Sequence, residues 1–276
     1  MGVYAAATGG VRGPGSVNGG FSEMRTGLTS ITFRQLNCAE IVELVRQAGL
    51  DGIEWGGDIH VPPGQLEAAR EARRLTEDAG LVCSSYGSYY RLGDDRPQQP
   101  FEMVLDTAEA LGVAMVRIWP GSQGSEQAGA VYRRLVAQEA HDAGTMAAAR
   151  GMQVAFEFHG GSLTDTAESA VELLESVNHP AVGTYWQPPL PLAVEKRCEG
   201  LQLLMPWVRN VHVFQWTGPH NERLALSAGV EAWTRYLEVL GTTERDGFLL
   251  IEYVRDDAPE AFLEDARVLG EWSKSQ

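Results

Sequence analysis

The 276-residue chain has little cysteine and no long hydrophobic run. Its three cysteines, Cys38, Cys83 and Cys198, are scattered and far from any C-x-x-C spacing, which fits a protein of the reducing cytoplasm. No apolar run reaches the roughly 18 residues needed to cross a bilayer. The first two dozen residues also lack the basic start and continuous apolar core of a signal peptide. We therefore expect a cytoplasmic protein.

Positive charge is also scarce. Lysine and arginine number 22 against 37 aspartates and glutamates, which gives a formal net charge of −15. This balance repels a phosphate backbone and no basic run opposes it, so neither nucleic acid nor an acidic membrane is an expected partner. No G-x-G-x-x-G follows the first predicted strand, and residues 121–130 contain glycines without a lysine at phosphate-loop spacing. A small-molecule sugar or polyol substrate remains open.

What the sequence does contain is an alternation of short apolar runs with amphipathic segments. Residues 1–26 are predicted to form a flexible tail, and no linker rich in proline, glycine and serine interrupts residues 27–276, which we interpret as one domain. Eight strands, each followed by a helical stretch, favour a closed (β/α)₈ TIM barrel over an open α/β sheet. The predicted strands are 28–33, 51–55, 81–86, 113–119, 152–158, 181–186, 208–214 and 247–253. The clearest helical stretches are 39–49, 64–80, 128–150 and 259–272.

Acidic and imidazole side chains occur at the ends of several predicted strands. In a TIM barrel the carboxyl ends of the strands build the active site. Side chains alternate along a strand, so Glu157 shares a face with His159 in "VAFEFHGG". His212 in "NVHVF" and Glu252 in "LLIEYV" have comparable positions. A carboxylate in a buried strand is costly without compensation, and a hard or borderline divalent ion would supply it.

With these motifs the chain resembles the xylose-isomerase-like TIM-barrel superfamily, the sugar phosphate isomerase/epimerase and AP-endonuclease-like group, over roughly residues 27–272. The resemblance implies one divalent ion held by Glu157, His212, Glu252 and the residue that follows strand six. That residue is an aspartate in the group but Gln187 here, in "YWQPP". An amide oxygen still binds a hard cation, with lower field strength, so we expect weaker metal affinity or a role for Gln187 toward substrate. Mn²⁺ is the expected ion, with Mg²⁺, Co²⁺ or Zn²⁺ as alternatives.

The resemblance also implies a reaction, an isomerase or epimerase step that begins with proton abstraction next to a ketose carbonyl. Glu157 and Glu252 would be the catalytic carboxylates. Two alternatives stay open at this point. The same site could serve a lyase or dehydratase acting on an oxidised sugar or inosose, or the chain could be a non-catalytic sugar-binding barrel with a degraded metal site. A homodimer or homotetramer is also left open.

Further residues are candidates for substrate binding, each with a plainer interpretation. Glu54 and His60 in "EWGGDIH" suit a substrate hydroxyl, although Glu54 could equally form a salt bridge at the barrel mouth. His159 could donate to substrate or hold its loop, and Trp119 and Trp186 could stack on a sugar ring or simply pack. Arg255 could bind substrate or pair with Glu252, and Glu157 could likewise pair with an arginine.

Overall fold

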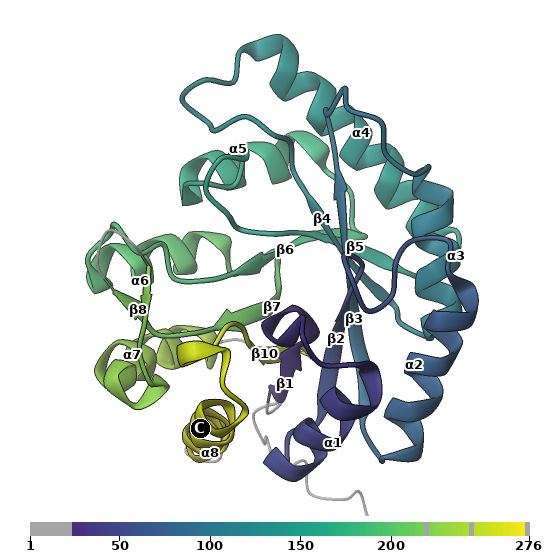
Figure 1. The fold of residues 1–276 in the computed structure, drawn as a ribbon. Coiled ribbons are helices and arrows are strands. Elements are labelled where there is room, and N and C mark those ends of the chain that lie inside the picture. The colour runs from purple at the N-terminus through teal and green to yellow at the C-terminus, as the bar shows by residue number, and fades with distance from the viewer. Residues whose placement is uncertain (1–23, 218–220, 243–245, 274–276) are drawn as a thin grey trace, which may run out of the picture.

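Eight parallel strands close into a barrel, and helices surround it (Figure 1). This computed structural model describes residues 24–217, 221–242 and 246–273. The strand order around the barrel is β1-β10-β7-β6-β5-β4-β3-β2. The barrel strands are β1 (Arg25–Thr29), β2 (Gly52–Gly56), β3 (Val82–Arg91), β4 (Met115–Trp119), β5 (Gln153–Phe156), β6 (Val182–Trp186), β7 (Val208–Val213) and β10 (Phe248–Ile251). The predicted TIM-barrel fold is confirmed.

The helices follow the strands in the expected alternation. They are α1 (Cys38–Ala48), α2 (Leu66–Asp78), α3 (Phe101–Leu111), α4 (Ala130–Ala148), α5 (Ala167–Val177), α6 (Val194–Leu204), α7 (Val230–Leu240) and α8 (Pro259–Ser273). Their limits come from local signals. At the start of α1, Asn37 and Glu40 form a reciprocal capping box, and Gly49 ends the helix with a left-handed φ of 69°.

The first predicted strand is placed wrongly. The strand runs over Arg25–Thr29, two residues before the predicted domain start, whereas Ser30–Phe33 forms a 3₁₀ turn. The β-branched and aromatic residues of "ITF" favour a strand, but their side chains are held by other contacts. Thr32 Oγ1 accepts from the Tyr253 backbone N–H at 3.0 Å, and Phe33 packs edge-on against Phe262. Residues 1–23 of the predicted tail lie outside the described residues.

A short antiparallel hairpin, β8 (Trp216–Thr217) with β9 (Glu222–Arg223), and the short turns η2 (Leu226–Gly229) and η3 (Arg255–Asp257) were not predicted. Two-residue strands carry too little alternation to be recognised from sequence. The three cysteines are free, as expected.

Two apolar clusters divide the core. The larger lies between the strands and the helices. The smaller contains Ala155, Tyr185, Phe248 and Leu250, with Met115 packed against it, and fills the barrel interior. Because side chains alternate along a strand, residues two positions beyond these also face inward. Arg117 follows Met115 on this face, Glu157 follows Ala155 and Glu252 follows Leu250. The fold therefore directs charged side chains to the carboxyl end of the barrel.

Candidate functional site

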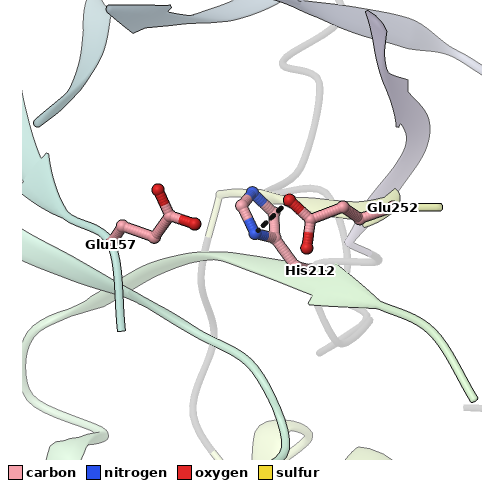
Figure 2. Close-up of side chains that lie close together, drawn as sticks. All are labelled: Glu157, His212 and Glu252. Carbon is pink, nitrogen blue, oxygen red and sulfur yellow. Dashed lines mark ion pairs between the residues drawn. The ribbon is translucent and has the colours of Figure 1, made fainter. Parts of the chain in front are cut away.

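Glu157, His212 and Glu252 converge at this end of the barrel, as Figure 2 shows. One potential ligand atom from each lies within 4.8 Å of the others, and all three side chains are buried. Glu157 and Glu252 directly follow β5 and β10, and His212 lies in β7. The carboxylates of Glu157 and Glu252 point inward from either side of the imidazole. Carboxylate oxygen and imidazole nitrogen are a donor set for Mn²⁺, Mg²⁺, Co²⁺ or Zn²⁺, so this triad could hold a divalent ion.

Gln187, which follows β6, contributes a fourth polar atom. Its Oε1 lies 3.0 Å from His212 Nδ1, and the same nitrogen lies 3.4 Å from Glu252 Oε1. The His212 nitrogen therefore faces two oxygen atoms, and the amide stands beside the triad at the position where the resemblance implied an aspartate. The geometry brings together all four predicted metal ligands.

A buried arginine, which the sequence interpretation did not select, lies next to this group. Arg117 on β4 is 1% exposed and pairs with two glutamates. Its Nε donates to Glu54 Oε1 at 3.0 Å, and its Nη1 donates to Glu157 Oε2. Arginine inside the otherwise apolar run "VAMVRIW" was the available signal. The interpretation that Glu157 pairs with an arginine therefore holds alongside the metal hypothesis.

The buried glutamates lie in different electrostatic environments. Burial alone would raise the pKa of Glu54, but Arg117 and then His212 outweigh it and lower the pKa to about 2. Burial raises the pKa of Glu252, an effect that His212 only partly offsets and that Glu157 reinforces. For His212, burial disfavours the charged imidazole, yet Glu252 and Glu54 together raise its pKa. Glu252 therefore binds a proton more readily than Glu54.

When its carboxylates are ionised, the site around His212 carries an excess of negative charge. Three buried carboxylates, Glu54, Glu157 and Glu252, face one guanidinium, Arg117. Two negative charges remain while His212 is neutral and Glu252 is ionised, and uncompensated buried charge is costly. His212 Nε2 is also buried without a hydrogen bond, 3.6 Å from Glu54 Oε1. The donor set and this excess of negative charge both fit a divalent cation.

Neutral residues fix the position of Glu54 and Arg117. Ser85 Oγ donates to Glu54 Oε2 at 2.9 Å, and Tyr185, beneath His212, accepts from Asn210 Nδ2 at 2.8 Å. Gly87 leaves the room that the arginine occupies, because a Cβ there would lie 2.6 Å from Arg117 Nη2. None of these residues was predicted, since each is ordinary in its strand.

Aromatic and charged side chains form the rim above the site. Arg34 donates to Asp58 at 2.7 Å, to the Tyr253 hydroxyl at 3.0 Å and to the Tyr89 hydroxyl at 3.3 Å. Both tyrosines have a left-handed backbone, with φ of 61° at Tyr89 and 50° at Tyr253. Such conformations are uncommon outside glycine and often accompany functional sites. The Tyr89 ring also lies 5.5 Å from the Arg117 guanidinium carbon.

The remaining predicted residues divide into those near the site and those away from it. Glu54 is part of the charged group. Trp119 is the last residue of β4, and the His159 ring packs against its indole, with ring centroids 4.6 Å apart. His60, by contrast, contacts the segment between β1 and α1, where Ser30 Oγ and the Leu36 carbonyl each lie 3.1 Å from its ring nitrogens.

Two predicted substrate-binding residues are not brought to the group. Trp186 is 1% exposed and packs against Tyr236 and Trp233 of α7, on the outer side of the barrel wall. Alternation explains this, because Tyr185 takes the inward position on β6. Arg255 is exposed and lies 3.7 Å from Glu264 and 3.8 Å from Asp256.

The family model described as xylose isomerase-like TIM barrel matches residues 42–272. The chain belongs to this family. A curated relative, 3-dehydroshikimate dehydratase of Bacillus anthracis, is 24% identical over 206 residues, 68% of this chain and 71% of the relative. Within the described residues, no helix is long and apolar enough to cross a membrane.

Several solved structures share the fold of this chain. The probable 3-DHS dehydratase AsbF of Bacillus anthracis superposes with a TM-score of 0.74 at 21% identity, covering 90% of this chain and 99% of that one. D-psicose 3-epimerase, solved in the presence of D-fructose, gives 0.71 at 15% identity, covering 91% and 99%. A Mycobacterium smegmatis member in complex with magnesium gives 0.68 at 17% identity, covering 91% and 97%.

Proposed function

We propose that this protein is a divalent-metal-dependent enzyme that removes a proton from the carbon next to a carbonyl of a small sugar-like substrate. The observation that carries the proposal is the buried convergence of Glu157, His212 and Glu252 within 4.8 Å, in a site where three buried carboxylates face one arginine. Gln187 completes the proposed ligand set. The magnesium complex of the Mycobacterium smegmatis protein supports a divalent ion as the ligand.

The bound cation would supply positive charge to the substrate carbonyl oxygen as negative charge develops there. Glu252 is the proposed general base, because burial raises its pKa above that of Glu54, whereas Arg117 contacts both Glu54 and Glu157. Glu157 is held by Arg117, whose Nη1 donates to its Oε2. Arg117 therefore orients Glu157.

This asymmetry favours a reaction with one active base. In epimerisation the two carboxylates would have to exchange protons with the same carbon from opposite sides. In dehydration one base removes a proton and a β-oxygen substituent then leaves. We therefore favour a lyase or dehydratase reaction, in agreement with the dehydratase relative.

Isomerisation or epimerisation is the second candidate. Two glutamates approach the centre from either side of His212, as Figure 2 shows, which is an arrangement that proton transfer on both faces of a carbon requires. The fold likeness to D-psicose 3-epimerase is consistent with this reaction.

The test is incubation with Mn²⁺ or Mg²⁺ in deuterated water, using a panel of ketoses, inososes, 3-keto-glycosides and 3-dehydroshikimate. Loss of water from a compound identifies a dehydratase. Deuterium at a carbon next to the carbonyl, with an inverted or isomeric product, identifies an epimerase or isomerase. If no compound exchanges or reacts, and chelator leaves the thermal midpoint unchanged, the enzyme proposal is wrong and a sugar-binding barrel gains support.

A further inference from the structure

Arg91, the last residue of β3, lies beside the candidate centre in an unusual environment. Its guanidinium carbon sits 3.8 Å from the centroid of the Trp119 ring, where a cation–π interaction holds it. The backbone of Arg91 is fixed by Gln98, whose side chain accepts from its N–H at 3.0 Å and donates to its carbonyl at 2.6 Å. The backbone of Arg91 and its guanidinium group are therefore both held in place.

The place of Arg91 follows from the strand pairing. Arg91 is the partner of Trp119 between β3 and β4, and the Glu157 N–H donates to the carbonyl of Ile118, the residue before Trp119. His159, two residues after Glu157, lies against the same indole ring. The guanidinium, the indole and the imidazole therefore follow one another along the rim next to Glu157.

The other arginines around the mouth neutralise carboxylates. Arg117 pairs with Glu54 and Glu157, Arg34 with Asp58, and Arg223 with Asp257. Arg91, in contrast, forms no ion pair within the part of the chain that the structure describes. Its hydrogen bond there goes from Nη1 to the Gly121 carbonyl at 3.3 Å. In a chain with 37 acidic residues, the remaining N–H donors of Arg91 are left for another acceptor.

We propose that Arg91, supported on Trp119, is an anion subsite that binds a carboxylate or phosphate group of the substrate while the carbonyl lies at the metal centre. A guanidinium presents parallel N–H donors that match two oxygens of either group. The indole of Trp119 then serves as the support of the arginine and leaves no open ring face for a sugar on that side. This inference rests on the proposed function, because it assigns the substrate class of that site.

The test compares binding of matched compounds by isothermal titration calorimetry, with Mg²⁺ present. One pair is 3-dehydroshikimate and its methyl ester, and the other is D-fructose 1-phosphate and D-fructose. Wild-type protein should bind the anionic member of at least one pair about ten-fold more tightly than its neutral partner, as expected for a charge-assisted hydrogen-bonded pair. The pair that shows the preference identifies the carboxylate or the phosphate.

In Arg91→Gln this preference should fall to about two-fold or less, whereas Arg91→Lys should keep part of it, because lysine retains the charge without the planar fork. Arg46→Gln is the control, since Arg46 pairs with Glu43 on the surface of α1. Thermal midpoints confirm that each variant is folded. The proposal is overturned if neither anion is preferred by wild type, including the case where neither binds at millimolar concentration, or if Arg91→Gln keeps the full preference. An anion preference that depends on Arg91, without deuterium exchange, would support the subsite while the proposed reaction fails.

Discussion

The imidazole of His212 lies between two glutamates that face opposite situations. On one side, 3.6 Å from Nε2, Glu54 also receives the Arg117 guanidinium and has a pKa of about 2. On the other side, 3.4 Å from Nδ1, Glu252 forms no ion pair with an arginine of the described residues, and its pKa is raised by burial. Both carboxylates are buried, at 1% and 3% exposure. Because both side chains are buried, their charged neighbours, rather than the extent of burial, explain why their pKa values differ.

The two sides of His212 therefore differ in how their carboxylates are compensated. The Arg117 side carries a permanent cation, which fixes Glu54 and Glu157 in place. The Glu252 side depends on an imidazole, whose charge changes with pH. An ion or a proton can thus enter the Glu252 side, and the Arg117 side acts as its support. This comparison also explains why one glutamate is the proposed base although three are present.

Glu252→Gln provides the largest test of the comparison. Losing a general base slows proton transfer by about 10²- to 10⁴-fold, so dehydration or deuterium exchange of 3-dehydroshikimate should drop by that range at saturating Mg²⁺. Glu157→Gln removes a proposed ligand but not the proposed base. It should weaken metal binding while retaining much more of the rate once metal is saturating. Equal losses in the two variants would favour the two-base epimerase reaction instead.

Arg117→Met tests the supporting side. Removing one partner of a buried ion pair leaves uncompensated charge and costs about 3–5 kcal/mol, so the free energy of unfolding should fall by this amount at pH 7. Urea denaturation with chelator present measures it. Arg46→Met, which removes a surface pair with Glu43, should change the midpoint little. A loss at Arg117 no larger than that of the control would show that Glu54 and Glu157 do not depend on this guanidinium.

Much of this arrangement could be predicted from sequence because it depends on local patterns. Alternation along the strands placed Glu157, His212 and Glu252 on inward faces, and the spacing of the βα units predicted the barrel. Arg117 was missed because its partners, Glu54 and Glu157, are 63 and 40 residues away. Nothing in the local sequence states which side chain an inward arginine contacts.

Trp186 is the opposite case, a residue that was predicted to bind substrate but lies away from the site. It is an aromatic residue at the end of a predicted strand, and this position suggested stacking on a sugar ring. On a strand, however, adjacent residues face opposite sides, and Trp186 packs against α7. The limits of the first strand were predicted wrongly for a related reason, because the tertiary contacts of Thr32 and Phe33 overrode their β-propensity.

Gln187→Asp sharpens the comparison by adding charge to the Glu252 side. A third carboxylate in the proposed ligand set should raise affinity for Mg²⁺ or Mn²⁺ by about ten-fold, because ligand charge sets affinity for hard cations. Titration calorimetry measures this, with Gln202→Asp on the exposed surface of α6 as the charge-matched control. An unchanged affinity would indicate that Gln187 does not contact the ion and serves the substrate instead.

The pH dependence of stability should separate the two glutamates by sign. The folded protein holds a proton on Glu252 above its usual pKa of 4.5, so in metal-free protein this group's contribution is full below that pH and declines as pH rises. Glu54 has the opposite behaviour, because its contribution is present above pH 4.5 and is lost as pH falls toward 2. Glu252→Gln should therefore gain stability relative to wild type as pH increases from 5 to 7. Glu54→Gln should be less stable than wild type across that range.

Mg²⁺ should reverse the first of these results. An ion bound between Glu157, His212 and Glu252 favours the ionised carboxylate, so wild type should gain stability with rising pH in saturating Mg²⁺ and Glu252→Gln should gain less. The difference in unfolding free energy between the two proteins, measured in urea with Mg²⁺ and with chelator, should then change sign at pH 7. If it keeps one sign in both conditions, the cation does not bind at Glu252, and the excess negative charge must be balanced in another way.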